Sequence, residues 1–232
     1  MTEGPAATRR KRTLIVSDVH LSQTHPDIPS DPMWMRYRRA DLHPDAEFAA
    51  LVDHALADFE GDAIELVFNG DVLDFDAPWV KDGQSSFEEF PVDDAGCAAQ
   101  AERILSDHPG WFRAVARLLL AGHRVLFLSG NHDVELYWPG ARAAIREHLV
   151  VLCRNEAVAA PRVTPEEIAT SIDERVRFRA WFHVTEDLIY LEHGSQYDIF
   201  NGVPWPMMPV GKKRDWVHPV MGKLAFKRTG SR

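Results

Sequence analysis

Four apolar runs of the sequence each end abruptly in polar residues, and this pattern constrains the fold more than any other feature. The clearest is residues 66–68, which run into Asn69-Gly70-Asp71-Val72-Leu73-Asp74. Short, continuous apolar runs with β-branched residues are typical of buried strands, and Gly70 permits a sharp exit. Open α/β sheets bind ligands at the carboxyl ends of their strands. The sequence therefore predicts an α/β fold with Asp71 at its site.

The other three runs repeat this arrangement. Residues 13–17 lead into Asp18-Val19-His20, residues 125–129 into Gly130-Asn131-His132-Asp133, and residues 188–192 into His193-Gly194. Aspartate, histidine and asparagine at the tips of four strands suggest one shared site, to which we expect all four tips to contribute.

The segments between these runs carry helix and strand signals. We expect a helix from Pro44 to Gly61, and a long helical region from Asp93 through Leu120 that breaks near Pro109-Gly110 and stops at Gly122. A short helix over residues 139–148 and a strand over residues 150–153 should follow. Residues 176–184 alternate between apolar and polar side chains, which predicts a half-exposed antiparallel strand paired with residues 188–192 around a turn at Glu186-Asp187.

Two connecting segments are expected to border the site. The loop of residues 21–43 follows the first strand tip, and such loops commonly line a site. Residues 75–91, with Trp79, Phe87 and Phe90, are predicted to form an irregular wall or lid.

Length and composition favour one domain, because 232 residues of ordinary apolar content can bury a sizeable core. We expect a disordered basic tail over residues 1–12, the main domain over residues 13–200, and a proline-rich, then basic, segment over residues 201–232. The formal charge of −9 gives no indication of a specific nucleic-acid partner. Two cysteines without a framework pattern and no secretory h-region at the N-terminus together predict a cytoplasmic protein.

The last residues of the chain are basic and contain aromatic side chains. Such an end would allow weak peripheral contact with a membrane surface or an acidic partner, resting on Trp205, Trp216 and Phe226. A frayed or truncated terminus is the simpler interpretation.

The residue types at the strand tips suit divalent metal ions. Asp18 and His20 alternate along an extended segment, so both can face one ion. Asp71, with two carboxylate oxygens, can bridge two ions roughly 3.5–4 Å apart, the spacing used in two-metal phosphoryl chemistry. Asn131 and His193 would complete the second ion's ligands. Such a pair would lower the pKa of a bridging water and stabilise the phosphoryl oxygens during in-line attack.

His132 and Asp133 are the candidate catalytic residues. His132 could protonate the leaving oxygen, and Asp133 is expected to orient its ring. Asp74 could hold the loop or a supporting hydrogen bond. Each residue alone has a simpler interpretation as a turn, helix cap or surface group, and only the set points to a metal site. The remaining histidines, such as His25, His108 and His218, are expected to have solvent or capping roles.

Together, these motifs resemble the successive motifs of the calcineurin-like metallophosphoesterases over roughly residues 14–198. The resemblance implies a four-layer α/β/β/α sandwich with mixed sheets and two divalent metal ions (Mn, Fe or Zn) between the loop tips. By this likeness Asp18 and His20 hold the first metal, Asp71 bridges, Asn131 and His193 hold the second, and His132 is the catalytic histidine.

Within that superfamily the segments Ser17-Asp18-Val19-His20-Leu21-Ser22 and His193-Gly194 resemble the bacterial branch containing UDP-2,3-diacylglucosamine pyrophosphatase. Its best-known members carry arginine where His132 stands, which makes a lipid-precursor substrate the minority expectation. The superfamily pattern closes with Gly-His-x-His, one histidine per metal, and nothing after His193 matches it. We therefore expect a C-terminally incomplete version of that pattern.

Two functions from different classes follow. The first is a metal-dependent phosphoesterase that hydrolyses a phosphate monoester, diester or pyrophosphate in a phosphorylated small molecule or nucleotide-like substrate. The alternative is a catalytically impaired or truncated metallophosphoesterase-like protein that binds a partner or a phosphorylated ligand through the old site. An unfinished sheet edge would also permit an oligomer.

Overall fold

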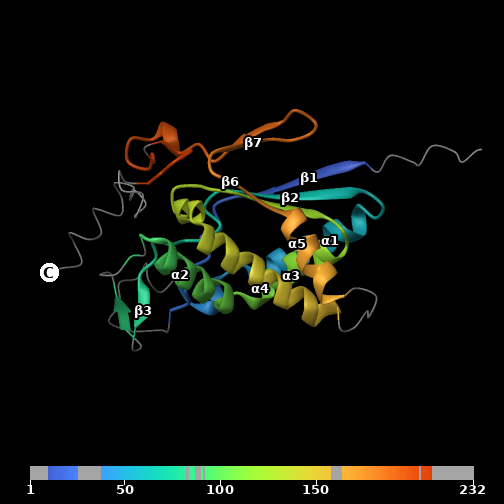
Figure 1. The fold of residues 1–232 in the computed structure, drawn as a ribbon, viewed down its shortest axis with the longest axis horizontal. Coiled ribbons are helices and arrows are strands. Elements are labelled where there is room, and N and C mark those ends of the chain that lie inside the picture. Colours follow the sequence, from blue (N-terminus) through green and yellow to red (C-terminus); the bar gives the residue numbers. More distant parts are fainter. Residues whose placement is uncertain are drawn as a thin grey trace, which may run out of the picture.

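The core of the molecule is a four-stranded parallel sheet covered by helices (Figure 1). The computed structural model describes residues 10–25, 38–81, 84–86, 90, 92–157, 164–203 and 205–210. The strands are β1 (Lys11–Val16), β2 (Ala63–Asn69), β5 (Arg124–Leu128) and β6 (Val176–Arg179), in the order β1-β2-β5-β6. All three pairings are parallel, so the carboxyl ends of the strands lie along one edge. The predicted α/β class is confirmed.

The helices connect successive strands and lie together on one side of the sheet (Figure 1). They are α1 (Asp45–Asp58), α2 (Asp94–Asp107), α3 (Pro109–Leu120), α4 (Pro139–Ala157) and α5 (Pro165–Arg175), with short 3₁₀ turns η2 (Ala40–Leu42), η3 (Val134–Tyr137) and η4 (Ser195–Tyr197). Local signals set their ends: Asp93 caps α2, and Thr164 with Glu167 forms a capping box at α5. The predicted break before Pro109 is confirmed, since α2 ends and α3 begins on either side of His108.

Aromatic side chains fill the space between the sheet and the helices. Phe68 of β2 lies 4.9 Å from Phe127 of β5, which stacks on Phe178 of β6 at 5.2 Å. Phe48 of α1 stacks on Trp111 of α3 with ring centroids 3.5 Å apart. All of these rings are at most 9% exposed, so they anchor three strands and two helices in one core.

A separate antiparallel pair, β7 (Phe182–Val184) and β8 (Tyr190–Glu192), lies on the opposite side of the parallel sheet (Figure 1). Polar contacts attach it: Nε2 of His183 lies 3.5 Å from Glu65, and Nδ2 of Asn69 donates to the carbonyl of Glu192 at 3.1 Å. The prediction of one strand over residues 176–184 is wrong. The chain bends after Arg179, because residues 176–179 pair in parallel with β5 and only residues 182–184 pair with β8.

Other predicted boundaries also need correction. The expected strand over residues 150–153 is part of α4, whose buried positions Ala141, Ile145, Leu149 and Cys153 continue at helical spacing. The expected irregular segment after Phe75 contains a short hairpin, β3 (Trp79–Lys81) with β4 (Gln84–Ser86). β1 begins at Lys11, two residues earlier than expected. Residues 1–9 and 211–232, including Trp216, His218 and Phe226, lie outside the described part, as does Phe87.

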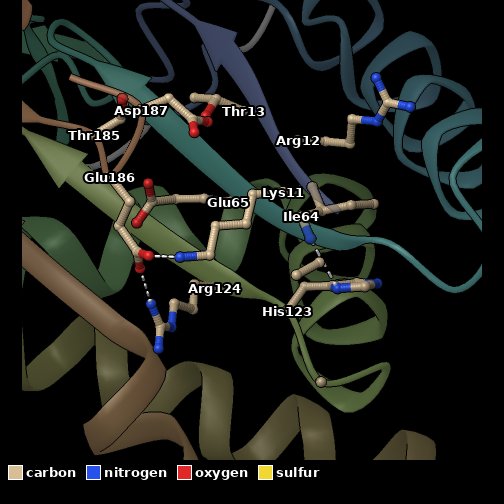
Figure 2. Close-up of a pocket in the computed structure, with 12 residues that line it drawn as sticks. Lys11, Arg12, Thr13, Ile64, Glu65, His123, Arg124, Thr185, Glu186 and Asp187 are labelled. Carbon is tan, nitrogen blue, oxygen red and sulfur yellow. Dashed lines mark hydrogen bonds and ion pairs between the residues drawn. The ribbon is translucent and has the colours of Figure 1, made fainter. Parts of the chain in front are cut away.

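The amino ends of β1, β2 and β5 border a pocket of about 220 Å³ (Figure 2). Glu186, from the turn between β7 and β8, forms ion pairs there with Lys11 of β1 and Arg124 of β5. This pocket lies at the opposite end of the sheet from the predicted site. None of the helices in the described part of the chain combines the length and apolar character needed to span a bilayer.

Candidate metal centre

Backbone hydrogen bonds bind the first two strand tips to each other beyond the end of the sheet. The N–H of Asp18 donates to Gly70 O (3.2 Å), that of His20 to Asp71 O (2.9 Å), and that of Leu21 to Val72 O (2.8 Å). These bonds continue the pairing of β1 with β2 through the two motifs. The two tips therefore form one rigid unit rather than two independent loops.

The backbone is strained at three of the predicted site residues. Asp18, His20 and Asp71 have φ values of 56°, 54° and 53°, in the left-handed region that residues with a side chain rarely adopt. Each such residue costs about 1–2 kcal/mol, and strain of this kind persists only where the surrounding structure imposes it. Its concentration at these positions indicates that the backbone is shaped to aim these side chains.

Two glycines allow the tips to approach closely. A Cβ on Gly70 would lie 2.7 Å from the Cβ of His193, and one on Gly130 would lie 2.7 Å from the backbone N of Asp71. Both distances are below any real contact, so only glycine fits. Gly70 also has a φ of 86°. The β2 tip thus meets β8 at Gly70, and the β5 tip meets the β2 tip at Gly130.

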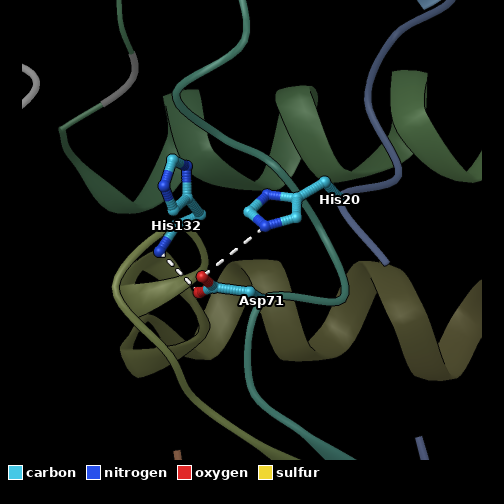
Figure 3. Close-up of side chains that lie close together, drawn as sticks. All are labelled: His20, Asp71 and His132. Atoms are coloured by element: carbon cyan, nitrogen blue, oxygen red, sulfur yellow. Dashed lines mark hydrogen bonds and ion pairs between the residues drawn. The ribbon is translucent and has the colours of Figure 1, made fainter. Parts of the chain in front are cut away.

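Asp71 lies at the centre of the cluster and is 3% exposed. Its Oδ1 accepts a 2.8 Å hydrogen bond from the backbone N–H of His132, and its Oδ2 lies 3.2 Å from His193 Nε2 and 3.8 Å from His20 Nε2 (Figure 3 shows the His20 and His132 contacts). Two groups of side chains each have ligand atoms within 4.8 Å of one another: His20, Asp71 and His132, and Asp18, Asp71 and His193. Asp71 belongs to both.

His193 is held with its Nε2 atom facing the cluster. Its Nδ1 lies 3.0 Å from the carbonyl oxygen of Asn69, which can only accept, so Nδ1 carries a proton. Nε2 then faces Asp71 and the Oδ1 of Asn131, at 3.2 Å each. A backbone carbonyl behind a metal-ligating histidine is the usual arrangement that fixes the tautomer and ring orientation. Asn131 is 5% exposed and shares this side of the cluster.

His132 is oriented by Asp74. Its Nδ1 lies 3.2 Å from Asp74 Oδ1 and 3.4 Å from Asp76 Oδ2. The prediction that Asp133 orients this ring is wrong. Asp133 is fully buried, and its oxygens accept from the backbone N–H groups of Gly130 (2.6 Å) and Val72 (2.9 Å). Asp133 thus joins the β5 tip to the β2 tip. Asp74, and not Asp133, orients the His132 ring.

Opposing effects set the charges in the cluster. Burial alone would lower the pKa of His193, but the hydrogen bond and charge of Asp71 outweigh it and raise that pKa to about 9. Burial would raise the pKa of Asp74, yet His132 and the Arg38 charge lower it to about 2. Burial raises the pKa of Asp133 to about 7, and the Asp71 charge adds to the effect. The cluster therefore holds concentrated negative charge balanced by imidazoles, which is the environment a cation would stabilise.

The donor set fits divalent metal ions. It combines carboxylate oxygens, imidazole nitrogens and one amide oxygen, the ligands that Mn, Fe and Zn accept. The two groups that share Asp71 contain all the predicted ligands except Asn131. Asn131 lies beside His193. The groups also include His132, for which only a catalytic role was predicted. The predicted ligands Asp18, His20, Asp71, Asn131 and His193 thus lie together, although β8 reaches the site from outside the parallel sheet. The expected sharing of one ion by Asp18 and His20 is not reproduced, because the two residues have a left-handed rather than an extended backbone and fall in different groups.

Two residues of the site escaped the sequence analysis. Arg38 donates from Nη2 to Asp74 Oδ2 at 3.0 Å, and Asp76 lies beside His132. Asp76 follows Asp74 by two residues, which was an available signal, whereas nothing in the sequence marks Arg38 among the charged residues of its loop. Comparisons of the chain with protein-family models, with curated proteins and with solved structures found no match.

Proposed function

We propose that this protein is a metal-dependent phosphoric ester hydrolase that uses two divalent ions. The observation that carries the proposal is the pair of ligand groups that share Asp71, a residue with two carboxylate oxygens and almost no exposed surface. A carboxylate shared between two ligand sets can hold two ions at the short separation that two-metal phosphoryl chemistry uses. Asp18 and His193 would lie on one side of Asp71, with Asn131, and His20 on the other.

Bound ions would supply the Lewis-acid charge that stabilises phosphoryl oxygens and lowers the pKa of water. The protein's own groups would do the remaining work. His132, backed by Asp74, is 32% exposed and can hold a proton at Nε2 for the leaving oxygen. Asp71 would fix the relative position of the ligands. The strained strand tips would hold the ligand side chains in the geometry for binding before the ions arrive.

We also propose that the fold is the four-layer α/β/β/α sandwich of the calcineurin-like metallophosphoesterases, near the bacterial branch named above. The helix layer, the parallel sheet and the β7–β8 pair on its other face support this assignment (Figure 1). The motif order Asp18/His20, Asp71/Asp74, Asn131/His132 and His193 supports it further. A phosphorylated small molecule or nucleotide-like compound is the substrate class.

The test is to count manganese ions bound per chain by mass spectrometry under native conditions, and to assay the same sample with p-nitrophenyl phosphate and bis-p-nitrophenyl phosphate. The proposal expects close to two ions, metal-dependent turnover of one or both esters, and loss of turnover in excess chelator. A protein that binds no manganese, or turnover that continues in excess chelator, would contradict the proposed function. Bound metal without turnover would favour the alternative, a binding protein built on the same site.

A further inference from the structure

Asp74 lies behind two histidines of the site at once. Its Oδ1 is 3.2 Å from His132 Nδ1, and its Oδ2 is 3.8 Å from His20 Nδ1. The two rings meet edge to face with centroids 4.7 Å apart. One carboxylate therefore faces the Nδ1 atoms of both rings, while His20 Nε2 lies on the opposite side, toward Asp71. The orientation of both rings depends on where this single carboxylate sits.

The Asp74 carboxylate is itself held from two directions. The backbone N–H of Asp76 donates to Oδ1 at 3.0 Å, and the Arg38 guanidinium donates to Oδ2 at 3.0 Å. Asp74 is 2% exposed, so its charge has little access to water and requires an internal partner. The Arg38 side chain is 21% exposed, and its Nη1 atom is buried. The guanidinium is thus mostly buried beside Asp74, where it can act as the internal partner that the carboxylate requires.

We propose that Arg38 is a positioning residue: it fixes the Asp74 carboxylate, which in turn keeps His20 and His132 with Nδ1 inward and Nε2 outward. The catalytic part of this inference rests on the proposed phosphoesterase function, whereas the positioning part concerns the protein alone. A carboxylate that accepts from Nδ1–H fixes the neutral ring in the tautomer whose Nε2 can bind a metal or exchange a proton, and Asp74 lies within that reach of His132 at 3.2 Å. His20 Nδ1, at 3.8 Å, is beyond hydrogen-bond distance and is attracted only by the charge of the same carboxylate. Without Arg38, the Asp74 carboxylate would keep only the hydrogen bond from the Asp76 N–H, and both rings would lose their fixed orientation.

Arg39 offers a matched control. It is the next residue in the sequence, and it bonds Asp41, which is 61% exposed, rather than Asp74. Arg38→Met and Arg39→Met remove the same charge from neighbouring positions. Arg38→Lys keeps the charge but not the planar guanidinium, and Arg38→Gln keeps a donor without the charge.

The first readout is the tautomer of His20 and His132 in the metal-free, full-length protein, from two-bond ¹H–¹⁵N NMR spectra of the neutral rings. We expect the Nδ1–H form in the wild type and in Arg39→Met, and a mixture of forms in Arg38→Met. Unchanged spectra in Arg38→Met would overturn the inference. If Arg38→Met fails to fold, the same comparison is made with Arg38→Leu, which also lacks a donor, and unchanged spectra there overturn it equally.

The second readout is a double-mutant cycle with Asp74→Asn, measured as hydrolysis of p-nitrophenyl phosphate with Mn²⁺. Removing a group that supports a ligand typically costs about 10–100-fold, so Arg38→Met should lower kcat by that amount with little change in KM, and Arg38→Lys should recover part of it. If Arg38 acts through Asp74, adding Arg38→Met to Asp74→Asn should cost little more. Fully additive losses would overturn the inference. A wild-type protein without turnover would contradict the proposed function alone, and the NMR spectra would still decide the role of Arg38.

Discussion

The two ends of the parallel sheet are built from different kinds of interaction. At the carboxyl end, Asp71 and Asp74 are buried, and several residues adopt a left-handed backbone. At the amino end, the ion pairs of Glu186 with Lys11 and Arg124 join side chains that are 47–57% exposed. Buried, strained and close-packed groups tolerate little change, whereas exposed ion pairs are weak and replaceable. The difference supports placing the proposed site at the carboxyl end of the sheet.

The largest expected effect is the loss of activity in Asp71→Ala. Because Asp71 belongs to both ligand groups, its removal should abolish the binding of two ions and lower metal-dependent hydrolysis by about 1,000-fold or more. Steady-state kinetics and metal counting measure both effects. The control is Asp187→Ala, the same substitution at the amino end of the sheet. Retained activity in Asp71→Ala, or an equal loss in Asp187→Ala, would remove the distinction between the two ends.

Gly70→Ala should cause the next largest effect, this time on folding. Gly70 and Gly61 have nearly equal φ values of 86° and 85°, but a Cβ on Gly61 would meet nothing within 4 Å, whereas one on Gly70 would overlap His193. The left-handed conformation costs about 1 kcal/mol in both variants. The overlap should cost Gly70→Ala about 1–3 kcal/mol more. The difference in urea unfolding between Gly70→Ala and Gly61→Ala measures the cost of the overlap with His193 alone. Equal unfolding midpoints would mean that the β2 tip and β8 are not closely packed.

The stability of the metal-free protein should depend on pH through His193. Its pKa is raised to about 9 in the folded state against 6.5 in the unfolded state, so the folded state binds the proton more tightly. This stabilisation is fully present below pH 6.5 and is lost as the pH rises through 9. Wild type should therefore lose stability relative to His193→Gln over that range, as urea titrations would measure.

His54→Gln is the control for this pH dependence, because His54 is 71% exposed and pairs with Asp58 within α1. The difference in the free energy of unfolding between His54→Gln and wild type should vary little over the same pH range. A His193→Gln variant that parallels wild type at every pH would contradict the contact between His193 and Asp71.

The smallest effect is expected at the amino end of the sheet. Glu186→Gln removes the partner of Lys11 and Arg124 at exposed positions, where ion pairs contribute about 0–1 kcal/mol and are screened by salt. Activity should be unchanged, and the small loss of stability should disappear at about 1 M salt. A loss of activity in Glu186→Gln would show that the β7–β8 turn affects the site through His193.

Part of the site was predictable because its signals are local. An apolar run followed by glycine and aspartate predicts a strand that ends at a carboxylate, and parallel strands end at the same edge of a sheet. The chain therefore indicated that Asp18, His20, Asp71 and Asn131 would meet. The capping residues Asp93 and Thr164 show the same locality, since the hydrogen bonds that they accept come from backbone N–H groups three residues away.

The errors arose where pairing or packing decided between equally good local patterns. Residues 150–153 are apolar enough for a strand, yet α4 continues through them because Leu149 and Cys153 pack against the core. The alternation over residues 176–184 is real, but β5 offers a parallel partner to Val176 and Phe178, so the chain divides after Arg179. Periodicity describes which face of a segment is apolar and does not identify the segment that will cover it.

The sequence by itself determined the order of the strand tips, the polar groups that each tip carries and the class of metal ion that those groups suit. Only the tertiary structure decided which carboxylate faces which ring. Asp133 is adjacent to His132 in the sequence but bonds Gly130 and Val72, whereas Asp74, 58 residues away, contacts the ring. Arg38 reaches Asp74 from a different loop. A buried carboxylate takes whichever donors the packed backbone brings within reach, and sequence adjacency does not fix that choice.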